Sequence, residues 1–146
     1  MSTRRKLLFI SAGPLDHPQL RSGAELREIT SRIREALPAE RFAIEVETAA
    51  KRSELAHLLL FHKPEIVHFS GHGESKKGIL LEDERGRAAA VDGKSLAALF
   101  SLLRGTLQTV VLNACSTKRI ARELQKVVDY TIAMNGPIYD IAAVAF

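Results

Sequence analysis

The sequence predicts a three-layer α/β fold, with a mostly parallel central sheet, helices on both faces and an inserted β-hairpin. Short apolar runs alternate with helix-length segments along most of the chain. Two of these runs, residues 66–69 and 109–112, are almost wholly apolar, as expected of strands covered on both faces. Crossovers of helix length between successive strands favour parallel pairing.

The first third of the chain predicts a strand, a helix and a second strand. Residues 6–12 form a short apolar run closed by a Gly-Pro pair, which indicates a buried strand. Ser22 and Glu25 have the spacing of a helix capping box, and apolar residues then recur at helical intervals until Pro38. Residues 42–47 alternate in polarity, so we expect a strand with one wetter face near the sheet edge.

The middle third predicts a helix, a buried strand and a hairpin. The helix opens at Ser53, and the strand over residues 66–70 runs into a turn flanked by glycines. Residues 78–82 and 88–91 flank the polar turn 83–87, which predicts the hairpin. Because this hairpin follows the turn closely, we expect it to line a substrate groove there.

The last third returns to the alternation of helix and strand. Asp92 or Ser95 can cap a helix that ends near Gly105. The further predicted elements are a strand, a basic helix, a core strand and a final helix, over residues 109–112, 118–128, 129–134 and from Asp140 onward.

The composition is that of an ordinary soluble globular domain. With 146 residues, 46% hydrophobic and 26% charged, the chain suits one well-filled core, so we expect residues 1–146 to form a single domain. A lone cysteine, Cys115, excludes an internal disulfide and favours the cytoplasm. No apolar run reaches membrane-spanning length, and the net charge of +4 is interleaved with acids and few aromatics. We expect neither a membrane nor a nucleic acid as partner.

Reactive side chains follow the two most apolar strands. His72 lies just beyond the strand over residues 66–70, and Cys115 just beyond the strand over residues 109–112, at the expected start of a helix. Because ligands and catalytic groups gather at the carboxyl ends of parallel strands, His72, Cys115 and the loop 135–140 should meet at one sheet edge. A thiol beside an imidazole is the arrangement of a cysteine nucleophile with its base.

The glycines around His72 favour the same chemistry. Gly71 and Gly73 let the backbone turn sharply and leave room for a substrate carbonyl. The backbone amides of Gly73 and Cys115 can then form an oxyanion hole, which stabilises the charge of an acyl-transfer intermediate.

Structural roles are the alternative for each of these residues taken singly. A lone cysteine is often buried, and a histidine in a glycine-rich turn often only caps a loop. His68 lies inside its strand, where a hydrogen-bonded core histidine is expected. A metal site built from His68 and His72 lacks matching acids or cysteines, so we expect no metal and no cofactor. Surface positions are expected for His17, His57 and His62.

Four ordered blocks resemble the CHAT domain, a prokaryotic branch of the caspase-like cysteine proteases. The blocks are residues 68–73, 78–83, 110–115 and 129–134. The resemblance implies a caspase-hemoglobinase fold, His72 as general base and acid, Cys115 as nucleophile, and hydrolysis of peptide bonds without a cofactor. It also implies fusion to sensor or repeat domains and a bacterial signalling or antiphage defence role.

The chain departs from this family at two places. Ser116 and Thr117 follow the nucleophile where many relatives have an aromatic residue and then serine. The chain also ends inside the helix expected after Asp140, before a further strand that the family uses to complete its specificity pocket. We therefore expect a domain truncated before its last helix and strand.

Substrate-binding roles follow from the resemblance. Asn113, two residues before the nucleophile, lines the specificity pocket of caspase-like proteases, and Asp140 stands where relatives that cleave after basic residues often carry an acid. A buried carboxylate recognises an arginine guanidinium strongly. The alternative for Asp140 is an ordinary helix N-cap, and for Asn113 a hydrogen bond within its loop.

Two rival functions belong to other classes. A catalytically inactive protein-interaction module would keep the fold without a reactive thiol. A flavodoxin-like sensor would need a glycine-rich phosphate loop after the first strand, and residues 11–15 lack that pattern.

Overall fold

The computed structural model describes residues 4–134, which form a five-stranded parallel sheet and a smaller three-stranded antiparallel sheet. The large sheet has the order β2 (Phe42–Glu47), β1 (Arg5–Ser11), β3 (Ile66–Ser70), β7 (Thr109–Asn113) and β8 (Tyr130–Ala133). The small sheet has the order β4 (His72–Glu74), β5 (Gly78–Glu82) and β6 (Ala88–Val91).

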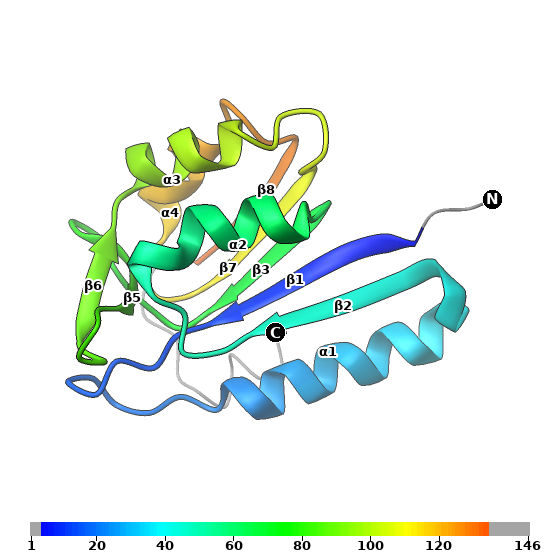
Figure 1. Cartoon of the computed structure of the whole chain (residues 1–146), viewed down its shortest axis with the longest axis horizontal. Helices are drawn as coiled ribbons and strands as arrows, with labels where there is room; N and C mark the ends of the chain where they lie inside the picture. Colours follow the sequence, from blue (N-terminus) through cyan, green and yellow to red (C-terminus); the bar gives the residue numbers. More distant parts are fainter. Residues whose placement is uncertain (1–3, 135–146) are drawn as a thin grey trace.

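Four α-helices and two short 3-10 turns connect the strands. The helices are α1 (Ser22–Ala36), α2 (Leu55–His62), α3 (Gly93–Ser101) and α4 (Lys118–Leu124), and the turns are η1 (Ala39–Arg41) and η2 (Arg52–Glu54). α1 lies on one face of the large sheet and α2, α3 and α4 on the other (Figure 1). The predicted three-layer α/β sandwich, with its parallel sheet and inserted hairpin, is confirmed.

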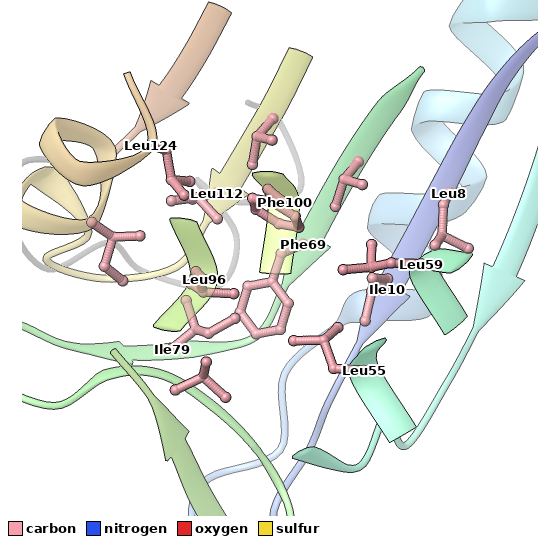
Figure 2. Close-up of a cluster of buried hydrophobic side chains, with 14 of the residues drawn as sticks. Leu8, Ile10, Leu55, Leu59, Phe69, Ile79, Leu96, Phe100, Leu112 and Leu124 are labelled. Carbon is pink, nitrogen blue, oxygen red and sulfur yellow. The ribbon is translucent and has the colours of Figure 1, made fainter. Parts of the chain in front are cut away.

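The hydrophobic core fills the space between the sheet and α2, α3 and α4. Alternate residues of β1, β3 and β7 point to this face, because side chains along a strand alternate between its two sides. They pack against leucines and Phe100 from the three helices. Phe69 lies within this cluster beside Ile79 of the hairpin, so one core joins the two sheets (Figure 2). Full burial of a leucine, isoleucine or phenylalanine side chain such as these stabilises a fold by about 2 kcal/mol.

The opposite face of the sheet is polar where α1 begins. Two adjacent rows of the strand register point toward α1: Phe9, His68 and Val111, then Ser11, Ser70 and Asn113. The Phe9 ring stacks on the His68 imidazole at 5.3 Å between centroids. Glu25 is the buried residue of α1, and it meets this polar row.

Several local predictions are wrong, each for a tertiary reason. Ser22 and Glu25 form no capping box, because the Glu25 carboxylate turns inward to the sheet. β8 is an edge strand of the described sheet rather than a core strand, with Tyr130 69% exposed. α4 ends at Leu124, earlier than expected, and β4 is an additional strand. His62 is buried rather than at the surface, because Glu47 of the edge strand accepts its hydrogen bond at 2.8 Å.

The sheet order decides where the candidate site is built. β3 and β7 are direct parallel neighbours, with Ile66 opposite Thr109 and Ser70 opposite Asn113. Their carboxyl ends therefore lie side by side, and the loops that carry His72 and Cys115 leave from the same edge. This adjacency, which the sequence predicts, is confirmed.

Candidate active site

Cys115 lies in a tight turn between β7 and α4. Ser116 has a φ of +55°, a left-handed conformation that costs a non-glycine residue energy and is enriched at functional sites. Thr117 is fully buried, and its hydroxyl donates to the carbonyl of Ala114 at 3.1 Å. Its backbone and side chain also bond the backbone of Met134, so the turn is fixed to the end of β8. Cys115 precedes the first residue of α4 by three positions, rather than lying in its first turn.

His72 opens β4 and is held by a backbone carbonyl. Its Nε2 lies 2.7 Å from the carbonyl oxygen of Pro18 in the β1–α1 loop. Since a carbonyl can only accept, Nε2 carries the proton of this hydrogen bond, and Nδ1 keeps its lone pair in the neutral ring. In this tautomer, Nδ1 of His72 can accept a hydrogen bond or a proton.

Gly73 brings the histidine loop against the cysteine turn. A Cβ atom built on Gly73 would overlap the carbonyl oxygen of Cys115 and lie 3.3 Å from the Cβ of Ala114. The backbone of residue 73 therefore packs directly on the backbone of the Cys115 turn. Only glycine permits this approach without a shift of one loop.

The β1–α1 loop that holds His72 is itself fastened to the hairpin turn. The Leu15 amide donates to the carbonyl of Gly86 at 2.8 Å, and the Ala88 amide donates to Asp16 Oδ1 at 3.0 Å. The hydrogen bond from Ala88 lowers the pKa of the Asp16 carboxyl below its usual value. His17, in the same loop, lies beside His72 at 5.3 Å between ring centroids.

A buried polar cluster lies under the ends of β3 and β7. Glu25, 4% exposed, accepts from His68 Nε2 at 2.5 Å and Asn113 Nδ2 at 2.8 Å through Oε1, and from the Ser70 hydroxyl at 2.5 Å through Oε2. Ser22 Oγ lies 3.2 Å from Ser70 Oγ. We name Glu25, His68, Ser70 and Asn113 the Glu25 cluster.

The Glu25 cluster explains His68, the core histidine that the sequence predicts. Its partner is a carboxylate of α1, the helix that covers this face of the sheet. The pairing therefore cannot be recognised from the sequence of the strand alone. The signal that could have found it is an acidic residue in the first turn of a helix that must pack on the sheet.

The predicted site residues fall into three groups. Gly73 packs on the Cys115 turn at the sheet edge, and the imidazole of His72, the preceding residue of β4, lies on the Pro18 carbonyl. Asn113, two residues before Cys115, is 3% exposed, and its side-chain amide donates a hydrogen bond to Glu25. Asp140 and the loop 135–140 lie outside the described residues.

Pro18 was missed by sequence reasoning, because a backbone carbonyl has no signature in a sequence.

Within residues 4–134, no group of three His, Cys, Asp or Glu side chains could hold a metal ion. The same residues include no helix of the length and apolarity needed to cross a membrane.

Comparison with known proteins gives a family and two relatives. The sequence model of the CHAT domain matches residues 2–134. A protein named Roc-COR-CHAT protease, from an unknown prokaryotic organism, is 24% identical over 149 residues, covering 97% of this chain and 14% of that protein. A protein named probable protease, from Gillisia limnaea (strain DSM 15749 / LMG 21470 / R-8282), is 22% identical over 130 residues, covering 88% of this chain and 23% of that protein. The chain thus spans less than a quarter of either relative.

Proposed function

The chain belongs to the CHAT-domain family, and from that premise we propose that it is a cysteine endopeptidase domain with His72 as base and Cys115 as nucleophile. The observation that carries this proposal is the packing of Gly73 on the Cys115 turn, at the carboxyl ends of two adjacent parallel strands. The names of both relatives as proteases support the same reaction class.

The first half of the proposed reaction forms an acyl-enzyme. His72 takes the thiol proton on Nδ1, while the Pro18 carbonyl holds the Nε2–H and stabilises the imidazolium that results. The thiolate of Cys115 attacks the peptide carbonyl, and the amides of Gly73 and Cys115 stabilise the oxyanion. The imidazolium then gives its proton to the leaving amine, and a thioester remains.

The second half regenerates the enzyme. His72 takes a proton from water, whose oxygen attacks the thioester carbonyl. Collapse of this intermediate releases the acid product and returns the thiolate, which recovers its proton from His72. With the substrate and one water molecule, His72 and Cys115 account for every proton in the cycle.

The dyad is tested by a double-mutant cycle in the full-length protein that contains this chain. Cys115→Ala and His72→Ala should each abolish peptide cleavage, and the double variant should be no worse than either, because the two groups act as one unit. His72→Ala should also slow alkylation of Cys115 by iodoacetamide near neutral pH, since the thiolate fraction sets that rate. His17→Ala, a change at the neighbouring imidazole, is the control for local disturbance.

Two results would overturn the endopeptidase proposal. One is full cleavage by Cys115→Ala. The other is an alkylation rate equal to that of free cysteine and insensitive to His72→Ala, together with no cleavage, which would favour a catalytically inactive interaction module.

We also propose that the domain cleaves after basic residues. Asp140, the acid proposed to bind the basic side chain, lies outside the described residues. The neutral amide of Asn113 offers no charge to a guanidinium. A desolvated cation needs an opposite charge, so Asp140→Asn should lower kcat/KM for peptides with arginine before the scissile bond by about tenfold or more.

The control for Asp140 is stability. If Asp140 also caps its helix, Asp140→Asn should cost only a few tenths to about 1 kcal/mol of unfolding free energy. Peptide-library profiling checks the preference directly. Unchanged arginine cleavage, or a preference for acidic or apolar residues, returns Asp140 to a capping role.

The domain acts, in this proposal, under control of other parts of a longer protein. The relative named Roc-COR-CHAT protease carries further modules in its name, and its alignment with this chain covers 14% of it. We propose a bacterial signalling or antiphage defence role, with regulatory domains as partners and a cytoplasmic location.

A further inference from the structure

A groove of about 380 Å³ opens between the β4–β5 turn, the start of α3 and α4. We name it the basic groove after the five cations that line it, Lys76, Lys77, Lys94, Arg119 and Arg122. All five side chains are exposed. The lining contains two carboxylates, those of Asp92 and Glu123, so the cations outnumber the acids.

Two glycines build this groove by allowing close backbone contact. A Cβ on Gly78, whose φ is +111°, would overlap the Val91 carbonyl, so the start of β5 is pressed on the end of β6. A Cβ on Gly93 would lie 3.2 Å from Ile120 Cα, so α3 begins directly on α4. The cations next to these contacts are therefore gathered on a packed junction of three elements rather than scattered over mobile loops.

The charges of the groove are only partly compensated from within. Lys77 pairs with Glu74 at 3.2 Å, and Glu123 pairs with Lys126 at 3.1 Å, outside the lining. Asp92 caps α3 through the Ser95 amide, which lowers the pKa of its carboxyl and keeps it ionised. Of the lining cations, Lys76, Lys94, Arg119 and Arg122 form no ion pair with a described residue. Like charges held together favour an anionic ligand.

The pattern of charge favours a polypeptide over a nucleic acid. Among residues 4–134, no aromatic side chain lines the groove, so these residues offer bases no stacking surface. Asp92 and Glu123 interrupt the cations and would repel a continuous row of phosphates. A peptide can place neutral residues against these carboxylates and acidic residues against the cations.

Two walls of the groove follow closely in sequence on the two loops of the candidate active site. Its β4–β5 wall begins two residues after Gly73, and its α4 wall reaches Arg119, four residues after Cys115. The basic groove is therefore built on the same chain segments that carry the histidine loop and the cysteine turn.

We propose that the basic groove binds an acidic segment of the protein substrate, apart from the residues at the scissile bond. This assignment of a substrate class rests on the endopeptidase proposal, but the binding it requires does not depend on chemistry. Exposed charges of this kind mainly set encounter rate and salt dependence.

Binding is tested with the Cys115→Ala form of the full-length protein. The probe is a fluorescein-labelled peptide that alternates glutamate with glycine, and the reference probe has glutamine in place of glutamate. Fluorescence anisotropy should show binding of the glutamate peptide that weakens with salt, and Lys94→Glu/Arg119→Glu should raise its Kd about tenfold or more. Arg27→Glu/Arg34→Glu on α1, which lies on the other face of the sheet, changes the net charge equally and should leave the Kd unchanged (Figure 1).

Cleavage separates this inference from the endopeptidase proposal. With an active enzyme, Lys94→Glu/Arg119→Glu should raise KM for an arginine peptide with an acidic extension and leave kcat and the cleavage of the unextended peptide unchanged. Binding without any cleavage would sink the endopeptidase proposal and keep the groove as an acidic-peptide site. If Lys94→Glu/Arg119→Glu leaves KM for the extended peptide unchanged, the groove assignment is overturned and the endopeptidase proposal stands.

Three binding results would also overturn the assignment of the basic groove to an acidic peptide segment. The glutamate peptide fails to bind even at low salt; both double variants weaken binding equally, which indicates general charge attraction; or oligothymidylate binds more tightly than the peptide with the same groove dependence, which indicates a nucleic-acid site.

Discussion

A single carboxylate, that of Glu25, connects α1 to the ends of both strands that carry the candidate active site. It accepts hydrogen bonds from His68 and Ser70 of β3 and from Asn113 of β7. His72 and Cys115 each follow the last of these strand residues by two positions. Because buried donors without partners are costly, this carboxylate fixes the relative positions of the two strand ends.

Removal of this carboxylate should destabilise the whole domain. Glu25→Ala removes the acceptor of three buried donors, of which Ser70 has a second acceptor in Ser22, so we expect a loss of roughly 3 kcal/mol in the free energy of unfolding, measured by urea denaturation. Glu25→Gln, which keeps one acceptor oxygen, should cost less. Glu28→Ala is the matched control on the same helix: its pair with Arg32 is exposed to solvent, so its loss should change the free energy of unfolding little. Equal losses of unfolding free energy for Glu25→Ala and Glu28→Ala would show that the Glu25 cluster does not stabilise the fold.

At the scale of elements, the site depends on how closely β4 approaches the turn after β7. β4 pairs with β5 of the hairpin, with His72 opposite Leu80 and Gly73 opposite Ile79. The hairpin is anchored in the core through Ile79, which is buried. The small sheet thus sets the position of His72, while the large sheet sets that of Cys115.

A methyl group at residue 73 should separate these two elements. Gly73→Ala would push the histidine loop away from the Cys115 carbonyl, and a misplacement of about 1 Å can cost on the order of 100-fold in turnover. Peptide cleavage and the alkylation rate of Cys115 both report it. Gly23→Ala in α1 is the control, because a methyl group at that position would have nothing within 4 Å, and it should raise stability by up to about 1 kcal/mol. Wild-type cleavage by Gly73→Ala would remove the close approach from the mechanism.

At the scale of the whole molecule, carboxylates in two loops accept hydrogen bonds from backbone amides of the hairpin. Asp16 accepts from the Ala88 amide, and Asp83 accepts from the amides of Arg85 and Arg87 within the hairpin turn. The bond from Ala88 lowers the pKa of Asp16, and the bond from Arg87 is the main cause that lowers the pKa of Asp83. The ionised Asp16 carboxylate therefore links the loop that carries Pro18 to the hairpin, and the ionised Asp83 carboxylate stabilises the hairpin turn itself.

These lowered pKa values predict loss of stability in acid. In the unfolded chain both carboxyls take up protons near their ordinary pKa of 3.8, whereas the folded chain binds them at lower pH. Their stabilising contribution is thus complete above 3.8 and is lost as the pH falls through the folded values. Urea unfolding over a pH series should show this decline, and Asp16→Asn should make it shallower. A slope for Asp16→Asn identical to that of the wild type would contradict the linkage.

Much of the fold could be predicted because it depends on local pattern. The apolar runs of β1, β3 and β7, the alternation in β2, the polar hairpin turn and the Asp92 cap of α3 are written in neighbouring residues. Strand and helix periods follow from backbone geometry, so a short window of sequence suffices to detect them. That residues 1–146 form a single domain truncated before its last helix and strand stays a prediction.

The sequence by itself determined the parallel α/β class and the adjacency of the two strands that precede His72 and Cys115. Only the tertiary structure decided that Glu25 turns inward, that Pro18 holds His72, that Gly73 rests on the Cys115 turn, and that β8 is an edge strand in the described sheet. Each of these depends on contacts between segments far apart in the chain. Packing creates such contacts, and no local preference of the residues involved encodes them.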